Sequence, residues 1–271
     1  MSIVWDVDPG VFSIFGREVR WYGILWATGI MLTTFVVQKM YKAEKLPEKW
    51  FDSLFVYVIV GLMIGARLGH CLFYEPEEYL SNPLKIFEVW KGGLSSHGGA
   101  IGMLIGICLF CRNVSKKSII WALDRLIVGV AIGATFIRLG NLMNSEIYGM
   151  ATDLPWGFIF VRNDTFASHP TQIYEALTYF VLFLIGMYMY WRTNAKEKQG
   201  LIIGVMLTGI FLSRFFIEFI KNVQEDFEIY LRNTIGLDMG QLLSLPFVIW
   251  GIWLIYNALK KGRVDSAKTK K

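Results

Sequence analysis

The chain has 271 residues, of which 54% are hydrophobic and 15% aromatic, and its mean hydropathy is +0.44. These values exceed those of an ordinary soluble domain and indicate a membrane protein. The net charge of +5 does not indicate nucleic acid binding, because the basic residues lie in short segments between apolar runs. Cys71, Cys108 and Cys111 all fall inside apolar runs, which argues against a disulfide framework or a zinc site.

Seven apolar windows are long enough to cross about 30 Å of hydrocarbon. In chain order they cover residues 21–41, 53–74, 94–111, 119–141, 170–191, 200–220 and 238–259. No internal repeat or flexible linker interrupts them. The sequence therefore predicts an all-α integral membrane protein with seven transmembrane helices, forming one multi-pass domain over residues 1–271. Within it we expect an extracytoplasmic arm at 1–20, a small irregular extracytoplasmic head region at 142–169 and a basic cytoplasmic tail at 260–271.

The orientation follows from the basic residues. The connecting segments 39–49, 112–117 and 192–198 and the tail 260–271 hold 16 of the 27 lysines and arginines. They fall on one side if the spans alternate, and the positive-inside rule makes that side cytoplasmic. The opposite segments hold only seven basic residues and most of the acids. We therefore expect an extracytoplasmic amino terminus and a cytoplasmic carboxyl terminus.

Charged residues within the spans require a reason, because an arginine at the bilayer centre costs roughly 2.5 to 3.5 kcal/mol on insertion scales. Apart from Asp124 and Arg125, the polar residues at the span ends fall toward the extracytoplasmic side. They are Arg20, Tyr22, Arg67, His70, His97, Arg138, His169, Gln172, Tyr174, Glu175, Arg214, Glu218, Asp238 and Gln241. This common depth predicts a polar site in the outer leaflet.

Helical spacing groups some of these residues. Arg214, Glu218 and Lys221 share one helix face, as do Arg67, His70 and Tyr74. For both groups the alternative interpretation is snorkelling or a structural ion pair between neighbouring helices.

The segment "FIRLGNLMNSEIYG", residues 136–149, ends the fourth span. Wound as one helix, it would place Arg138, Asn141 and Ser145 on one face and turn Asn144 away. We therefore expect the helix to break near Gly140, with irregular backbone after it that lines a polar cavity or is buried in protein. The alternative is a helix end capped by amides at the water interface, which explains the asparagines but not the arginine.

The segment "GGLSSHGGAIG", residues 92–102, places His97 between glycine pairs at the start of the third span. Glycines permit close backbone approach, and a histidine is suited to accept a proton near neutral pH. The alternative is that His97 only caps or packs the helix.

A cavity lined by arginines, amides and a histidine at this depth suits an anionic phospholipid. Arginine can bind phosphate oxygens in pairs and can stabilise a departing phosphate. The chain has no G-x-S-x-G nucleophile motif, and its cysteines lie in apolar spans. We therefore expect the nucleophile to come from a second substrate.

Seven segments together resemble the bacterial prolipoprotein diacylglyceryl transferase family, in order over residues 9–259. They are "RWYGI", "GARLGHCLFY", "GGLSSHGGAIG", "RLGNLMNSEIYG", "HPTQIYE", "RFFIEF" and "MGQLLSLP". The resemblance implies transfer of the diacylglyceryl group of phosphatidylglycerol to the lipobox cysteine thiol of a prolipoprotein signal peptide. A thioether forms and glycerol phosphate leaves, in the first step of bacterial lipoprotein maturation. It also implies a multi-pass protein of the bacterial inner membrane, in contact with membrane lipid, with no metal and no organic cofactor.

The resemblance also implies roles for individual residues. Arg138 would bind the lipid headgroup, Arg214 would act at the phosphate, and His97 is the candidate general base; these three are the predicted catalytic residues. The predicted substrate-binding residues are Arg138, Asn141, Asn144, Glu146, Tyr22, Gly98, Gly99, Glu218 and His169.

Other classes of membrane protein fit less well. A transporter or channel for an anionic or lipid-like solute is the leading alternative, but it needs polar residues through the inner half of the spans. There the sequence offers only Asp124 and Arg125. An intramembrane protease would need a nucleophile and base in the membrane, and a metal-dependent phospholipid synthase would need clustered aspartates.

Overall fold

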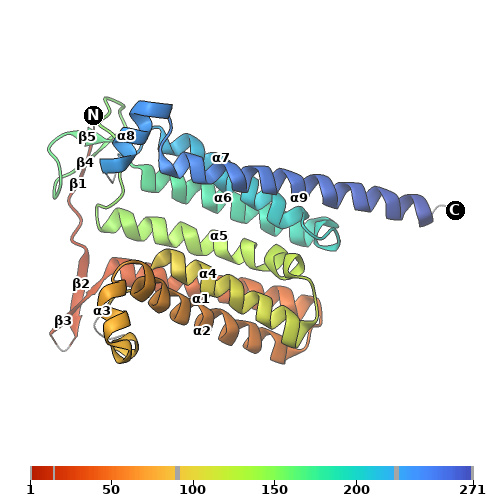
Figure 1. Cartoon of the computed structure of the whole chain (residues 1–271). Helices are drawn as coiled ribbons and strands as arrows, with labels where there is room; N and C mark the ends of the chain where they lie inside the picture. Colours follow the sequence, from red (N-terminus) through yellow and green to blue (C-terminus); the bar gives the residue numbers. More distant parts are fainter. Residues whose placement is uncertain (1, 15, 89–91, 223–225, 270–271) are drawn as a thin grey trace. The chain divides into compact units, whose positions relative to one another are not determined.

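The computed structural model describes residues 2–14, 16–88, 92–222 and 226–269, of which 226–230 and 262–269 are described by their backbone alone. In this part of the chain, seven helices are long and apolar enough to cross a membrane (Figure 1). They are α1 (Trp21–Ala43), α2 (Glu48–Phe73), α4 (Ser96–Phe110) continued by the π-helical turn η3 (Cys111–Ser115), α5 (Ile119–Met143), α6 (Thr171–Arg192), α7 (Leu201–Glu218) and α9 (Met239–Thr269). The prediction of seven spans is confirmed, with ends within about five residues of those expected except at α9, which continues ten residues past the predicted end at 259.

Shorter elements connect the spans. They are β1 (Ile3–Trp5), β2 (Gly10–Ile14), β3 (Arg17–Arg20), α3 (Pro76–Ser81), η1 (Pro83–Phe87), β4 (Phe158–Phe160), β5 (Ala167–Ser168), η4 (Ala195–Glu197) and α8 (Asp226–Ile235). The fold is thus mainly helical, and the region expected to be irregular carries short strands. The predicted tail at 260–271 is helical as far as Thr269, and residues 270–271 lie outside the described residues.

The chain divides into two compact units. Unit 1 comprises residues 1–37 and 123–271, and unit 2 comprises residues 38–122, so the boundaries fall inside α1 and α5. The single-domain organisation expected from the sequence stays a prediction.

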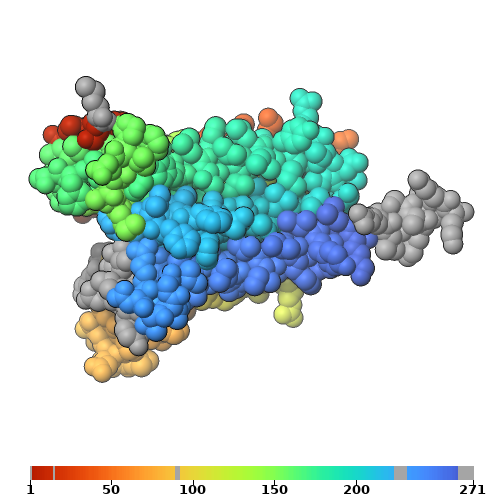
Figure 2. Space-filling model, turned by 90° about the horizontal axis from the view of Figure 1, so that it is seen from above, coloured from red at the N-terminus to blue at the C-terminus, as the bar shows by residue number. Residues whose placement is uncertain are grey.

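The head of unit 1 is a small sheet on an aromatic cluster. β1 pairs in parallel with β4, with Ile3 opposite Phe158, and β5 pairs antiparallel to β4. The indole Nε1 of Trp5 donates to the carbonyl of Leu142 at 3.0 Å, which ties this sheet to the end of α5. Figure 2 shows the N-terminal segment beside the green residues that include β4 and β5.

The helices of unit 1 approach closely at small residues. Thr33 on α1 donates to the carbonyl of Gly129 on α5 at 2.7 Å. α7 and α9 lie side by side (Figures 1 and 2), and Gly204 and Gly251 leave no room for a side chain between them. Van der Waals packing of this kind is a main source of helix association in lipid.

In unit 2, glycines on two helices face one another. Gly61, Gly65 and Gly69 lie on one face of α2, and Gly98, Gly102 and Gly106 lie on the facing side of α4. A Cβ atom added at any of these six positions would press into the opposing helix within 3 Å. The four-residue spacing of these glycines therefore allows the two backbones to touch.

Candidate functional site

Arg138 is held by a buried carboxylate. It lies near the end of α5, its side chain is 17% exposed, and its Nε lies 2.8 Å from Oε2 of Glu175. Glu175 is fully buried in the first turns of α6. A carboxylate without water needs a cation nearby, so this ion pair stabilises both side chains and fixes the direction of the guanidinium.

The residues after Arg138 form a hydrogen-bonded loop. Arg138 Nη1 donates to Asn141 at 3.2 Å, and the side-chain amides of Asn141 and Asn144 donate to the Glu146 carboxylate at 3.2 and 2.9 Å. Ser145 and Ile147 have positive φ angles of 56° and 59°, which bend the chain sharply there. The loop therefore presents the Glu146 carboxylate beside the arginine.

The helix was expected to break near Gly140; α5 continues three residues further, to Met143, and irregular backbone then follows as expected. Asn144 still donates its backbone N–H to the carbonyl of Gly140 at 3.1 Å. Gly140 instead provides room for Tyr22 of α1, since a Cβ atom there would lie 2.9 Å from the tyrosine ring. The glycine thus serves helix packing, and the irregular backbone begins about four residues later than expected.

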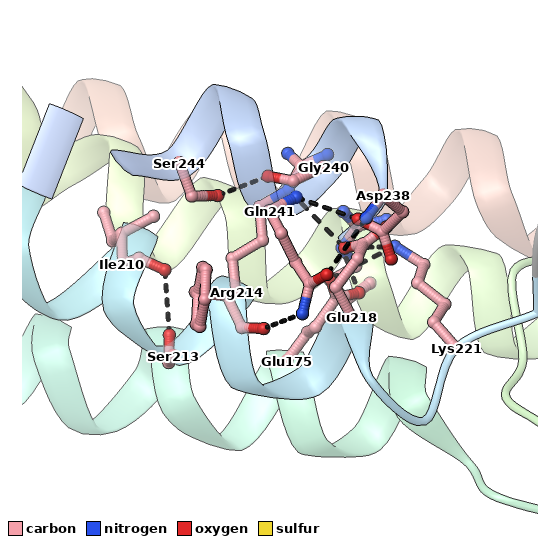
Figure 3. Close-up of polar contacts among 12 residues, drawn as sticks. Glu175, Ile210, Ser213, Arg214, Glu218, Lys221, Asp238, Gly240, Gln241 and Ser244 are labelled. Atoms are coloured by element: carbon pink, nitrogen blue, oxygen red, sulfur yellow. Dashed lines mark hydrogen bonds and ion pairs between the residues drawn. The ribbon is translucent and has the colours of Figure 1, made fainter. Parts of the chain in front are cut away.

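A second group of charges lies at the end of α7. Arg214 Nε is 3.8 Å from Glu218 Oε2, and Lys221 Nζ is 3.8 Å from Glu218 Oε2 and 3.5 Å from Glu175 Oε1 (Figure 3). Lys221 therefore links this group to the Arg138 ion pair. The prediction that Arg214, Glu218 and Lys221 lie together is confirmed by these contacts, but α7 ends at Glu218, so Lys221 lies beyond the helix and not on a shared helix face.

Backbone contacts hold Lys221 in place. It forms a β-bridge with Gly149, and Met150 donates its N–H to the carbonyl of Ile220 at 2.8 Å. The side chain of Asn222 donates to the carbonyl of Gly149 at 3.0 Å. The segment after α7 is thereby fastened to the segment that follows the Arg138 loop.

The start of α9 closes the site from another side. Asp238 accepts from the backbone N–H of Gln241 at 2.9 Å, and Gln241 Oε1 accepts from the N–H of Asp238 at 3.1 Å, which makes a reciprocal helix cap. Gln241 Nε2 also donates to the carbonyl of Phe215 on α7 at 3.2 Å. Gly240 faces Glu218 so closely that a Cβ atom would lie 2.6 Å from its carboxyl group.

His169 lies beside this site but points to a different set of partners. Its backbone N–H donates to Met150, and its carbonyl accepts from Gly149 at 2.8 Å. Its ring Nδ1 is 3.3 Å from the hydroxyl of Tyr174, which also accepts from Trp156 Nε1 at 2.9 Å. In the structure His169 therefore stabilises the loop, and its role in substrate binding stays a prediction.

His97 belongs to unit 2, where it is exposed in the first turn of α4. Ser95 caps this helix by accepting from the N–H of Gly98 at 3.2 Å. Gly98 and Gly99 pack against α2, which gives them a structural role. Because His97 and the two arginines lie in different units, their convergence on one substrate stays a prediction.

Arg67 in unit 2 is fully engaged by protein. Its side chain is buried, and its guanidinium donates to five carbonyl groups, those of Lys85, Ile86, Glu88, Gly92 and Gly93. Nearby, His70 stacks on Tyr74 and lies 3.5 Å from the carboxylate of Glu75. These contacts favour the structural interpretation of this group.

The sequence did not reveal how central Glu175 and Lys221 are. Glu175 stood out as a polar residue at a span end and Lys221 as a neighbour of Arg214 and Glu218 by helical spacing, but their pairing joins α6 to the segment after α7 and has no local signal. Among the described residues, no group of three or more histidine, cysteine, aspartate or glutamate side chains is placed to hold a metal ion.

Seven apolar helices and a buried series of ion pairs define a multi-pass membrane protein with a polar site suited to an anion. The family model described as prolipoprotein diacylglyceryl transferase matches residues 9–257. A phosphatidylglycerol–prolipoprotein diacylglyceryl transferase from Porphyromonas gingivalis is 55% identical over 269 residues, which are 95% of each chain. A protein of the same name from Bacteroides fragilis is 45% identical over 97% of this chain and 98% of its own. Another from Chloroherpeton thalassium is 42% identical over 97% of each chain.

The chain therefore belongs to the prolipoprotein diacylglyceryl transferase family. It is a transferase and a multi-pass protein of the bacterial inner membrane. The resemblance inferred from the seven sequence segments is confirmed, and a transporter or channel is not favoured.

Proposed function

We propose that the protein transfers the diacylglyceryl group of phosphatidylglycerol to the thiol of a lipobox cysteine in a prolipoprotein. The relatives' names give this lipid donor and this protein acceptor. The observation that carries the proposal is the arrangement of Arg138 and Arg214, which come from different helices and are joined through one network of buried carboxylates. Such a pair of guanidinium groups suits a phosphate that gains charge as it leaves.

The proposed reaction forms one bond and breaks one. The cysteine sulfur attacks the glyceryl carbon that carries the phosphate, and a C–S bond replaces the C–O bond. The departing oxygen keeps the electron pair, so glycerol phosphate leaves with added negative charge. The thiol loses its proton to a base, for which His97 is the candidate because a neutral imidazole can accept a proton near pH 7.

The loop after Arg138 would hold the headgroup. Asn141 and Asn144 fix the Glu146 carboxylate, which is exposed and can accept hydrogen bonds from the hydroxyl groups of the headgroup glycerol. Tyr22, packed on Gly140, would border the same loop. Glu218 would act as the counterion of Arg214, and Gly98, Gly99 and His169 would shape the surroundings of the substrate.

We also propose that the site faces the extracytoplasmic side, so that the acyl chains of the donor lipid stay in the outer leaflet. The support is the charge asymmetry of the connecting segments, which favours a cytoplasmic carboxyl terminus. Labelling of single cysteines placed at exposed positions such as Asp153 and Lys49 in intact cells would test this, since only the former should react with an impermeant reagent.

The activity is tested with the purified full-length protein, phosphatidylglycerol and a lipobox peptide, by mass spectrometry of the thioether product. Arg138→Ala and Arg214→Ala should each lower kcat/KM by about 100-fold or more, which is typical for the loss of a group that stabilises transition-state charge. Arg162→Ala is the matched control, because Arg162 forms an exposed ion pair with Asp8 at 3.4 Å. Undiminished product from Arg138→Ala would contradict its assignment, and no product from the parent would refute the activity.

The role of His97 requires a separate measurement. A general base stops working when it is protonated, so turnover of the parent should fall below neutral pH. His97→Gln should be slower and should lack this acidic limb. An acidic limb that persists unchanged in His97→Gln would count against His97 as the base.

A further inference from the structure

Lys221 carries a buried ammonium group that joins two carboxylates. Its side chain is 7% exposed, and its Nζ lies 3.5 Å from Glu175 and 3.8 Å from Glu218. Glu175 pairs with Arg138, and Glu218 pairs with Arg214. The charged groups therefore alternate in sign from one arginine to the other, with the lysine in the middle. Figure 3 shows the part of this series from Glu175 through Lys221 and Glu218 to Arg214.

The alternation leaves one positive charge in excess, because three cations face two carboxylates. Arg232 and Asp238, which lie 3.9 Å apart beside Glu218, contribute one charge of each sign and leave the excess unchanged. Glu146 carries a further negative charge, but it is exposed to water, which screens that charge, and it reaches Arg138 through the amide of Asn141. Without Lys221, the remaining two arginines and two glutamates would balance.

A single excess positive charge matches a phosphodiester headgroup with one negative charge. A zwitterionic headgroup brings no net charge and gains less from such a site. Lys221 and the two glutamates are largely shielded from water, whereas the Arg214 side chain is 36% exposed. Coulomb interactions between shielded groups are stronger and less screened than at a surface. The excess charge therefore discriminates between the two kinds of headgroup.

Lys221 also affects how firmly the glutamates hold the arginines. Arg214 and Glu218 approach only to 3.8 Å, and Arg214 Nε and Glu218 Oε2 make no hydrogen bond among the described residues. The guanidinium is thus attracted by charge but keeps N–H groups that can turn to a phosphate. If the lysine were neutral, both carboxylates would have only the arginines as cationic partners within the network, and they would compete with the lipid phosphate.

We propose that Lys221 determines headgroup specificity: it supplies the excess positive charge by which the site selects a monoanionic phospholipid over a zwitterionic one. Lys221 is a positioning residue, because it acts through Glu175 and Glu218 and not by contact with the reacting atoms. The inference rests on the proposed function, since it concerns the lipid donor of the same site.

The experiment compares the parent with Lys221→Met and Lys221→Arg in mixed micelles of neutral detergent. Initial rates are measured against phosphatidylglycerol, alone and with phosphatidylethanolamine as a competitor. Lys221→Met should raise KM for phosphatidylglycerol about tenfold with a smaller change in kcat, and phosphatidylethanolamine should become a comparable competitor. Lys221→Arg should behave as the parent, and Lys49→Met, at an exposed lysine, controls for the loss of one positive charge elsewhere.

A double variant separates charge from structure. Glu218→Gln combined with Lys221→Met removes one charge of each sign and restores the excess of one. It should regain at least part of the preference for phosphatidylglycerol that Lys221→Met loses. An unchanged preference in Lys221→Met, or no recovery in the double variant, would overturn the proposal. If Lys221→Met does not fold, the double variant and Lys221→Arg still test it, because both keep the excess charge and should keep the preference.

Lipid binding measured without turnover separates this inference from the proposed function. Native mass spectrometry of the full-length protein should show preferential binding of phosphatidylglycerol over phosphatidylethanolamine in the parent and a loss of that preference in Lys221→Met. A parent that forms no thioether but binds lipids with this pattern would refute the proposed reaction alone. A parent that forms thioether while Lys221→Met keeps its lipid preference would refute the role of Lys221 alone.

Discussion

Asp124 is a fully buried acid that caps a different helix, and its replacement should lower stability without changing the chemistry. It lies near the start of α5, where its two carboxylate oxygens accept from the backbone N–H groups of Gly200 and Ile203, each at 2.8 Å. Gly200 is the N-cap residue just before α7, with a φ of 92°, and it has no side chain to cap that helix. Asp124 therefore supplies the cap that the α7 sequence lacks.

The cost of Asp124→Ala follows from these two bonds. A hydrogen bond to a charged group contributes about 1.5–3 kcal/mol, and loss of a helix cap alone costs up to about 2 kcal/mol. Because both N–H groups belong to buried residues, we expect a loss on the order of 3 kcal/mol. That corresponds to roughly 6–12 °C in melting temperature for a chain of this size. Asp124→Asn, which keeps one acceptor oxygen, should lose about half as much.

The assay is thermal unfolding of the purified protein in detergent, followed by tryptophan fluorescence at one fixed heating rate. Asp153→Ala, at an exposed acid, is the control and should melt within about 1 °C of the parent. At a temperature where all variants are folded, kcat/KM of Asp124→Ala should stay near the parent value, because Asp124 lies about 21 Å from Arg138 along α5. An unchanged melting temperature, or lost turnover in a stably folded Asp124→Ala protein, would refute this reasoning.

Two further predictions concern packing and pH. Gly65→Leu should sharply reduce the yield of folded protein on size-exclusion chromatography, because a Cβ atom at Gly65 already collides with α4; Gly23→Ala, where a Cβ atom meets nothing within 4 Å, should leave the yield unchanged. Burial and the hydrogen bond to Asp164 raise the pKa of Tyr148 from 10.0 to about 12. The protonated Tyr148 hydroxyl therefore contributes its full stabilisation of the fold below pH 10, and this contribution is lost as the pH rises toward 12 and the hydroxyl ionises. The melting temperature should therefore fall less between pH 8 and pH 11 in Tyr148→Phe than in the parent. Equal falls in the two proteins would contradict the assignment.

The spans could be predicted from the sequence because hydrophobic length is a local property. The contact of Arg214 with Glu218 could also be predicted, since their i, i+4 spacing on α7 brings them together. The link from Lys221 to Glu175 could not, because it depends on how two segments far apart in the chain meet. Gly140 was misjudged for the same reason: its use is packing against Tyr22, a partner more than a hundred residues away.

Asp124 also bears on the class of protein. As one of two charged residues in the half of the spans predicted to be inner, it was the feature most compatible with a transport pathway. In the structure its carboxylate is occupied by the start of α7 and is fully buried. A group committed in this way to two backbone N–H groups is not available to a passing solute, in keeping with a transferase.

The number of unused hydrogen-bond donors distinguishes the arginines that the sequence could not tell apart. A guanidinium has five N–H donors. Arg67 makes five bonds to backbone carbonyls, so no donor remains for a ligand. Arg138 meets Glu175 through Nε and Asn141 through Nη1, and Arg214 faces Glu218 without a hydrogen bond at Nε. A phosphate can therefore bind to Arg138 or Arg214 without first displacing backbone contacts, but not to Arg67. Arg67→Ala should act through stability, whereas Arg138→Ala and Arg214→Ala should act through catalysis.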